Sequence, residues 1–237
     1  VQTCALPISL ILAQRTRVKY GSAMRVNELF VSIQGEGLDA GLPCTFVRFT
    51  ACNLRCTYCD TEYAFYEGGE VSLDDVVERV AAEGVDVVCL TGGEPLLQPD
   101  LPQLMQRLLD LEHRVIVETG GSLPLDKIPS GVIKVVDVKT PGALQTDPSE
   151  QGRKRFERQH FHYPNLDLLT ETDQLKFVLC DRADYEWALG FIDKHALVGR
   201  VAAILFSPVH PGLQPSDLSA WMLEDHAPAR LNLQLHK

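Results

Sequence analysis

Three cysteines lie on one short segment of the chain. Cys52, Cys56 and Cys59 occur in the run CNLRCTYCD, with the spacing C-x3-C-x2-C, and no fourth cysteine follows closely. A cubane [4Fe-4S] cluster normally takes four thiolates, so three thiolates leave one iron open to another ligand. The spacing therefore predicts an iron–sulfur cluster with an open coordination position, where one-electron chemistry could be done on a bound molecule.

Zinc is the alternative occupant of these thiols. Structural zinc sites close four ligands around the ion and commonly use C-x2-C pairs. This chain has no second pair, and no histidine lies near the cysteines in sequence. The spacing favours the cluster. The alternative hypothesis is a different class of protein, a non-catalytic zinc-binding module.

A glycine pair marks a second candidate site at Thr91-Gly92-Gly93-Glu94-Pro95. Glycines let the backbone approach a ligand closely, and they also serve an ordinary turn from a strand to a helix. The segment SIQGEG, from Ser32 to Gly37, is a third candidate, because glycines flank a carboxylate there. Arg48 interrupts an apolar run, so we expect a carboxylate partner, supplied either by the protein or by a carboxylated substrate.

The elements that must position these residues alternate along the chain. Several strand-like runs are almost continuously apolar, as parallel strands covered on both faces should be. The first cysteine and the glycine pair directly follow two of these runs, at the strand ends where α/β proteins place their active sites. The expected strands are Val26–Ile33, Thr45–Thr50, Val85–Leu90, Arg114–Glu118, Ile133–Val138, Leu175–Leu179, Val201–Phe206 and Arg230–Leu235.

Helical patterns separate these strands and predict βαβ units with a mostly parallel sheet. One helix follows the N-cap Ser72, and the others cover about Leu101–Glu112, about Ala183–His195 and a segment after Pro215. The stretch Thr140–Leu169 is rich in proline, glycine and charge, which predicts a long loop. Its histidines, His160 and His162, are expected at the surface.

Composition bounds the class of protein. The chain has 237 residues, 45% of them hydrophobic, and a formal net charge of −10, which argues against a nucleic-acid-binding surface. The apolar run near the start, Leu6–Ala13, is too short to span a bilayer. The seven cysteines suggest no disulfide framework, so we expect a reducing cytoplasm. Residues 1–23 are expected to be a leader, disordered or artefactual, ahead of a single domain at 24–237.

Taken together, these motifs resemble the 7-carboxy-7-deazaguanine synthase family of the radical S-adenosylmethionine (SAM) superfamily. The resemblance runs from about Val26 to Lys237. Generic radical SAM enzymes share the cysteine loop and TGGEP, whereas SIQGEG with CDT and the closing LQLHK is far more particular. Further signatures are ETGG at Glu118–Gly121, LKFV at Leu175–Val178 and SPVHPG from Ser207.

The resemblance implies a fold, a reaction and its cofactors. The fold would be α/β, a partial open (β/α) barrel of the radical SAM type. The reaction would be a lyase reaction of queuosine biosynthesis, which converts 6-carboxy-5,6,7,8-tetrahydropterin to 7-carboxy-7-deazaguanine with loss of ammonia. The reduced [4Fe-4S] cluster would cleave SAM to a radical that takes hydrogen from the pterin, and the protein would orient and shield these groups. Mg²⁺ would be the third cofactor.

The resemblance also implies residue roles. Cys52, Cys56 and Cys59 would hold the cluster, and Thr61 would bind Mg²⁺. The pterin would contact Ile33, Gln34, Gly35, Arg48 and Thr91. SAM would contact Tyr58, Cys59, Asp60, Gly93, Glu94, Asp137, Val138, Lys139, Ser207, Pro208, Val209 and His210.

Finally, the resemblance implies partners and a departure. A homodimer and a flavodoxin electron donor are expected, with no nucleic-acid or membrane partner. Family chains continue past the HK of the last signature into a short tail that closes the substrate pocket, so the C-terminal tail looks truncated at Lys237. The competing enzyme reading is a glycyl-radical-enzyme activating protein, which shares the cysteine loop but lacks a reason for SIQGEG and Arg48.

Overall fold

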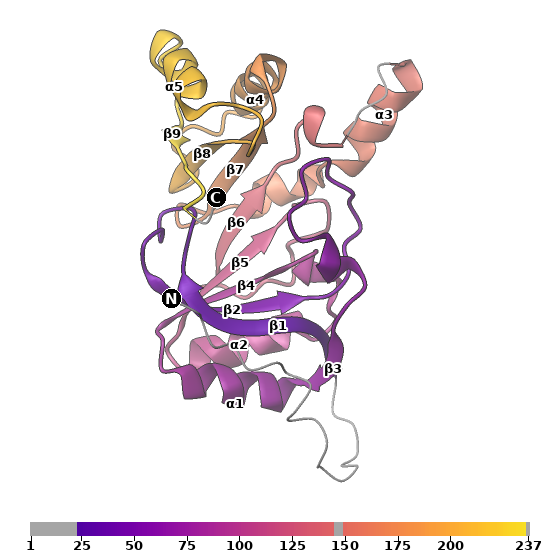
Figure 1. The fold of residues 1–237 in the computed structure, drawn as a ribbon, viewed down its shortest axis with the longest axis vertical. Coiled ribbons are helices and arrows are strands. Elements are labelled where there is room, and N and C mark those ends of the chain that lie inside the picture. The colour runs from indigo at the N-terminus through magenta and orange to yellow at the C-terminus, as the bar shows by residue number, and fades with distance from the viewer. Residues whose placement is uncertain (1–22, 145–148, 236–237) are drawn as a thin grey trace.

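The computed structural model describes residues 23–144 and 149–235. Within these ranges the strands form one nine-stranded sheet in the order β3-β1-β2-β4-β5-β6-β7-β8-β9 (Figure 1). β1 runs antiparallel to β2 and β3, and each later pair is parallel. The strands are β1 (Ala23–Ile33), β2 (Pro43–Phe49), β3 (Gly69–Ser72), β4 (Val87–Gly92), β5 (Arg114–Thr119), β6 (Ile133–Asp137), β7 (Gln174–Leu179), β8 (Ala203–Pro208) and β9 (Arg230–Leu231).

The helices begin and end at residues suited to those positions. Ser72 caps the first helix, because its side chain accepts a hydrogen bond of 3.1 Å from the Asp75 N–H, and Gly84 ends it in a left-handed conformation. No helix in the described ranges is long and apolar enough to cross a membrane. The helices are α1 (Leu73–Glu83), α2 (Leu101–Asp110), α3 (Glu150–Gln159), α4 (Arg182–Lys194) and α5 (Pro215–Glu224).

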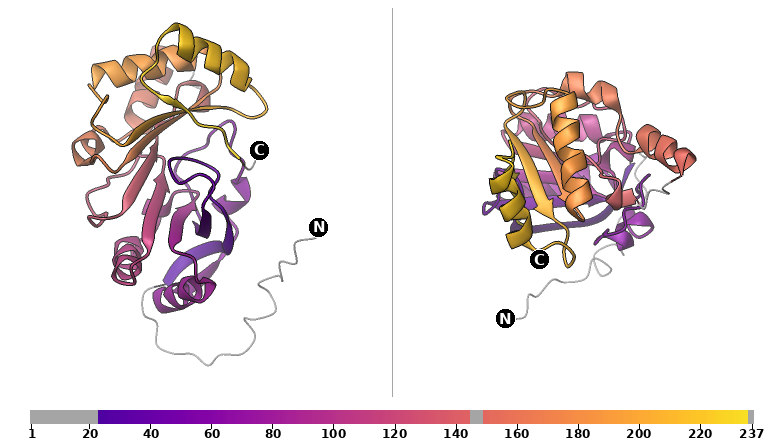
Figure 2. Two further views of the ribbon diagram at one scale, coloured as in Figure 1. Left: turned by 90° about the vertical axis from the view of Figure 1, so that its left-hand side faces the viewer. Right: turned by 90° about the horizontal axis from the view of Figure 1, so that it is seen from above.

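Helices cover one face of the sheet in two groups. α1 and α2 pack on β1, β2, β4 and β5, while α4 and α5 pack on β6, β7 and β8 (Figure 2). Side chains such as Val47 and Leu90 fill the first core, and Phe177 and Phe206 fill the second. Burial of this apolar surface is the main force that holds the helices against the sheet.

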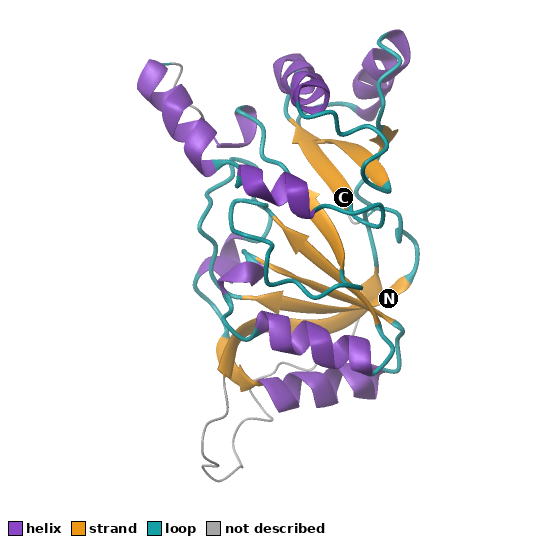
Figure 3. Cartoon of the chain, turned by 180° about the vertical axis from the view of Figure 1, so that it is seen from behind, coloured by secondary structure: helices purple, strands orange, loops and turns teal. Residues whose placement is uncertain are grey.

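The opposite face of the sheet carries a separate apolar layer made by the strands themselves. Cys44, Phe46, Cys89, Ile116 and Val135 belong to this layer, and each alternates along its strand with a residue of the helix-covered core. The alternation follows from the two-residue period of a strand. The helices α1, α2, α4 and α5 pack on the other face (Figure 3). The face that carries this apolar layer, called the inner face below, is therefore left to line a cavity.

The fold class expected from the sequence is confirmed: an α/β fold with a mostly parallel sheet. Each expected strand and helix is present, although β9 has only two residues. The expected leader at 1–23 lies outside the described residues, apart from Ala23, which begins β1.

The sequence analysis was wrong in two segments. β3 went unpredicted, because its four residues are too few to show a period. The stretch 140–169 is not a plain loop, since it contains α3, which extends outward from the fold (Figure 1). His160 is fully buried rather than exposed, and its ring stacks on Phe156 with centroids 4.2 Å apart. The charge-rich sequence of α3 concealed the buried Phe156 contact that holds it.

Candidate active site at the carboxyl ends of the strands

Polar side chains replace the apolar layer where the inner face reaches the carboxyl ends of the strands. Arg48, Thr91, Glu118, Asp137 and Lys176 each continue the inward register of one strand, from β2 to β7. The ladder places Arg48 opposite Thr91, and Asp137 opposite Lys176. Residues far apart in sequence therefore meet at one edge of the sheet, where α/β proteins bind ligands.

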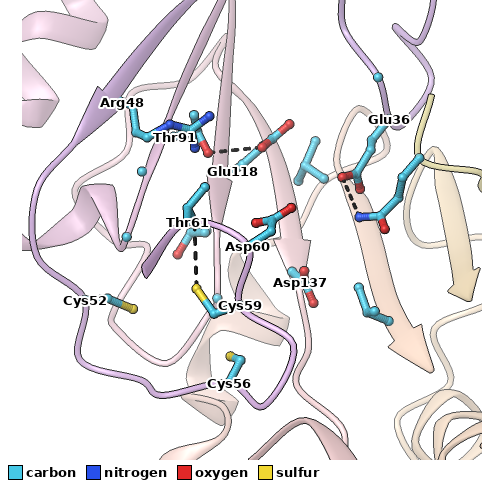
Figure 4. Close-up of a pocket in the computed structure, with 18 of the residues that line it drawn as sticks. Glu36, Arg48, Cys52, Cys56, Cys59, Asp60, Thr61, Thr91, Glu118 and Asp137 are labelled. Atoms are coloured by element: carbon cyan, nitrogen blue, oxygen red, sulfur yellow. Dashed lines mark hydrogen bonds between the residues drawn. The ribbon is translucent and has the colours of Figure 1, made fainter. Parts of the chain in front are cut away.

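These side chains line a cavity of about 460 Å³. The cysteine loop closes one side of the cavity, and the segment after β1 closes another (Figure 4). Arg48, Thr91 and Glu118 lie together on its wall, while Asp60 and Thr61 lie between them and the sulfur atoms (Figure 4). The volume falls within the usual range for a small-molecule site of about 300–1,000 Å³.

The three cysteines of the loop all line this cavity. The N–H of Leu54 donates a hydrogen bond to Cys52 Sγ, with an N···S distance of 3.4 Å. Burial raises the pKa of Cys52 and raises the pKa of Cys56 to about 11. Both thiols are protonated at neutral pH in the metal-free protein, so loading of a metal must release protons.

The three thiols could hold either a cluster or a single ion, and the two need different spacings between the sulfurs. Among residues 23–144 and 149–235, no three His, Cys, Asp or Glu side chains converge on a position for one metal ion. A zinc ion with bonds to sulfur of about 2.3 Å would need sulfurs about 4 Å apart. A cube of iron and sulfide holds each cysteine on a different corner, which requires a wider spacing.

The glycine pair joins the second motif to the cysteine loop. The N–H groups of Gly93 and Glu94 donate to the carbonyls of Phe49 and Ala51, at 3.1 and 2.8 Å. A Cβ on Gly93 would lie 2.9 Å from Cys52 Cβ, so no larger residue fits. The glycines thus allow close approach of two chain segments, and the N–H groups of Gly93 and Glu94 are already used within the protein.

Glu94 is almost completely buried, and its carboxylate is held firmly. It accepts hydrogen bonds from the Thr119 hydroxyl and from the N–H groups of Gly120 and Leu96, at 2.8 to 3.0 Å. Burial nevertheless raises its pKa above the ordinary value. The carboxylate borders the cavity beside the cysteine loop, where it can face a cationic group.

A row of alternating charges crosses the floor of the cavity. Lys176 Nζ lies 2.7 Å from Glu36 Oε2 and 3.2 Å from Asp137 Oδ2, and Lys139 Nζ lies 2.9 Å from the same Asp137 oxygen. Burial acts to raise the pKa of Asp137, but Lys139 and Lys176 outweigh it and hold that pKa below its usual value. Tyr58, whose hydroxyl is buried without a hydrogen bond, lies beside Lys139.

The wall opposite the cysteine loop carries a carboxylate and a guanidinium. Glu118 accepts hydrogen bonds from Thr91 Oγ1 at 3.1 Å and from Gln34 Nε2 at 3.2 Å. Arg48 Nε lies 2.7 Å from Glu28 Oε1, so the carboxylate partner expected for this arginine exists within the protein. Arg48 still borders the cavity, where its remaining N–H groups can meet a second carboxylate.

Most residues singled out in the sequence meet at this cavity. The cysteines, Thr61 and the five residues expected at the pterin all line it. Of the residues expected at SAM, Val138, Ser207 and Pro208 do not, because Val138 packs in the helix-covered core and the Ser207 hydroxyl accepts from Asn232 Nδ2 at 2.9 Å. The lining residues among those expected at SAM are Tyr58, Cys59, Asp60, Gly93, Glu94, Asp137, Lys139, Val209 and His210.

Sequence reasoning gave no role to Glu118, Lys176 or Gln234, and it used Glu36 only as the carboxylate of the SIQGEG segment. Glu118 lay inside the ETGG motif, which served only for the family resemblance. Lys176 stood in the apolar run LKFV with the same signal as Arg48, a charge within a buried strand, and that signal could have found it. Gln234, whose Nε2 donates to Glu36 Oε1 at 3.0 Å, lay inside the closing LQLHK signature, which carried no assigned role.

Comparison with known proteins identifies the family. The Radical SAM superfamily model matches residues 46–220. Curated relatives named 7-carboxy-7-deazaguanine synthase include one from Koribacter versatilis, 43% identical over 90% of this chain and 96% of its own length. Another, from Chlorobaculum tepidum, is 39% identical over 90% of this chain and 93% of its own.

A solved structure agrees with this family at the level of the fold. The crystal structure of QueE from Escherichia coli has a TM-score of 0.66 and 22% identity, and the match covers 90% of this chain and 94% of QueE. The superfamily match places the cysteine loop, the TGGEP segment and most of the cavity inside the shared region. The chain therefore belongs to the radical SAM superfamily and, within it, to the 7-carboxy-7-deazaguanine synthase family.

Proposed function

We propose that this chain converts 6-carboxy-5,6,7,8-tetrahydropterin to 7-carboxy-7-deazaguanine with loss of ammonia. The observation that carries the proposal is one cavity in which the three-cysteine loop faces Arg48, Thr91 and Glu118 (Figure 4). A carboxylated heterocycle needs a cation for its carboxylate and hydrogen-bonding groups for its ring edges, and this wall offers both. Two relatives whose alignments cover 90% of this chain carry the name of this activity.

The residues present fit the cofactors that the superfamily uses. The thiolates of Cys52, Cys56 and Cys59 would hold a [4Fe-4S] cluster, which with SAM supplies the radical that starts the reaction. Glu94 would face the amino group of SAM, and Asp137 Oδ1, buried without a hydrogen bond, would accept one from a hydroxyl or amino group. Tyr58 and Lys139 would cover the ligand on the loop side and exclude water.

The substrate would lie against the wall formed by β2, β4 and β5. Arg48 would bind the pterin carboxylate, and the Ile33–Gly35 segment would follow the ring edge. Glu118, oriented by Thr91 and Gln34, would accept hydrogen bonds from ring N–H or amino groups. A substrate so held presents one face to the cysteine loop, as the transfer of a hydrogen atom requires.

Thr61 is our proposed magnesium ligand. Its hydroxyl borders the cavity and does not cap the short helix Glu62–Phe65 that follows. Mg²⁺ prefers oxygen ligands and often keeps most of its own waters, so one hydroxyl with substrate oxygens suffices. A Thr61→Val change should raise the magnesium concentration needed for half-maximal turnover, whereas the iron content should stay unchanged.

Anaerobic reconstitution tests the reaction directly. The chain is loaded with iron and sulfide, reduced, and given SAM, Mg²⁺ and the pterin, and the product mass is measured. We expect 7-carboxy-7-deazaguanine together with 5′-deoxyadenosine. Cleavage of SAM with no deazaguanine would favour the glycyl-radical-enzyme activating protein instead, and a colourless protein that contains zinc would favour the binding module.

We also propose the setting in which the enzyme works. A flavodoxin would supply the electron, two copies of the chain would form a homodimer, and the reducing cytoplasm would keep the thiols free for the cluster. Mixing the cluster-loaded protein with a reduced flavodoxin tests the first, and sedimentation of the purified protein tests the second. A cluster that stays oxidised in that mixture, or a purely monomeric sedimentation profile, would count against them.

A further inference from the structure

Lys176 is shared by two carboxylates that belong to different parts of the cavity. Its ammonium lies 2.7 Å from Glu36, which follows the Ile33–Gly35 segment proposed to contact the pterin. The same ammonium lies 3.2 Å from Asp137, at the end of β6 and on the side proposed to contact SAM. Glu36 and Lys176 are 140 residues apart, and their side chains are only 13% and 10% exposed.

The two oxygens of the Asp137 carboxylate have different surroundings. Lys139 and Lys176 both approach Oδ2, at 2.9 and 3.2 Å, and Oδ1 is left buried without a hydrogen bond. The two cations hold Asp137 through one oxygen and leave the other buried without a hydrogen bond. Any ligand that binds beside Asp137 therefore meets a carboxylate whose orientation depends on Lys176.

Glu36 is held in a comparable way on the other side. Gln234 Nε2 donates to its Oε1 at 3.0 Å, while Lys176 holds Oε2. Burial acts to raise the pKa of Glu36, yet Lys176 outweighs it and keeps this pKa below its ordinary value. The carboxylate is thus charged at neutral pH, and its position depends on the same ammonium.

We propose that Lys176 is a positioning residue that couples the two halves of the cavity, so that SAM and the pterin bind cooperatively. The inference rests on the proposed function, since it needs both ligands in one cavity. A ligand in either half displaces water from around Lys176, and charges interact more strongly in drier surroundings. Both carboxylates are then held more firmly for the second ligand, which makes the coupling favourable.

Equilibrium binding measures the coupling without any turnover. The cluster-loaded protein is kept anaerobic and without reductant, and its dissociation constant for SAM is measured with and without saturating pterin. We expect wild-type protein to bind SAM about fivefold or more tightly when the pterin is present. Lys176→Met should bring this ratio close to one. An unchanged ratio in the variant, or a ratio of one in the wild type, would overturn the inference.

Two further variants separate coupling from simple damage. Glu36→Gln keeps the size of the side chain and removes only its charge, so it should also bring the ratio close to one even if Lys176→Met folds poorly. Lys134→Met is the matched control, because Lys134 is equally buried and pairs with Asp173 at 2.8 Å outside the cavity. It should keep the wild-type ratio, and loss of the ratio there would contradict a specific role for Lys176.

Turnover of the wild-type protein distinguishes this inference from the proposed function. Product formation together with a ratio of one would overturn the coupling and leave the function standing. If the pterin neither binds nor reacts, the function and the coupling fall together.

Discussion

Gly93 packs against Ala51 so closely that a Cβ on Gly93 would collide with the Ala51 carbonyl and lie 2.7 Å from its carbon. Ala51 immediately precedes Cys52, and it adopts a left-handed conformation with φ of 81°. The glycine motif therefore supports the cysteine loop directly. Two motifs that follow different strands therefore act as one structural unit. The cysteine loop can take this position only because Gly93 has no side chain.

Gly93→Ala should displace the start of the cysteine loop, because backbone cannot yield as a flexible side chain would. We expect the purified, reconstituted variant to carry much less iron and sulfide than the wild type. Gly190→Ala is the control, since nothing lies within 4 Å of its Cβ position and it lies within α4. That change should keep the full cluster and stabilise the fold by up to about 1 kcal/mol. Equal cluster content in both variants would contradict the role given to Gly93.

Cys56→Ala should abolish the cluster, since two thiolates cannot hold the cube. The measurement is the broad absorbance near about 400 nm with iron and sulfide analysis after anaerobic reconstitution. Cys180→Ala is the informative comparison. Burial and the neighbouring Asp184 carboxylate raise the pKa of Cys180 to about 12, and its side chain does not line the cavity. It should keep the cluster, and loss of iron there would make Cys180 a fourth ligand.

Arg48→Gln should weaken substrate use more than it weakens the fold. Hydrogen bonds to charged groups contribute about 1.5–3 kcal/mol, so kcat/KM for the pterin should fall about 10- to 150-fold. Most of the fall should appear in KM, while SAM affinity without pterin stays near the wild-type value.

Glu28→Gln tests whether Arg48 is only structural. It removes the charged protein partner of Arg48 but leaves the guanidinium in the cavity. If binding of the substrate carboxylate is the role of Arg48, this variant keeps most of its activity. A loss as large as that of Arg48→Gln would mean that the ion pair itself, and not the substrate contact, is what matters.

His160 should make the protein less stable in mild acid. Its Nδ1 donates to the Phe156 carbonyl at 2.8 Å, and burial lowers its pKa below the ordinary value. The unfolded chain takes up a proton below about pH 6.5, while the folded chain resists it, so the free energy of unfolding falls as the pH drops below that value.

Urea denaturation at about pH 7.5 and about pH 5.5, on either side of the ordinary histidine pKa, measures this contribution. His160→Phe keeps an aromatic ring for the stack on Phe156 and should show a smaller drop in midpoint between the two pH values than the wild type. His113→Gln, a partly exposed position, should show the wild-type drop. A drop in His160→Phe as large as that of the wild type would exclude His160 as the cause.

The longer strands and the cysteine loop could be predicted from local patterns. The apolar run from Val87 to Leu90 is contiguous in sequence, and the three cysteines lie on one segment, so local patterns could predict the strands and the cluster. β3 was missed because four residues show no period, and α3 was misread because the buried Phe156 lies within a charged stretch. Short or weakly patterned segments take their structure from their neighbours.

The sequence by itself predicted the three cysteines as cluster ligands, the glycine motif, the parallel strands and a carboxylate partner for Arg48, because each prediction depends on residue type and near spacing. Only the tertiary structure decided which side chains share the cavity. Lys176 with Glu36, and Gln234 with Glu36, join residues 140 and 198 positions apart. Such contacts arise from the register of strands in a sheet and the return of the C-terminal segment, and no local pattern encodes either of them.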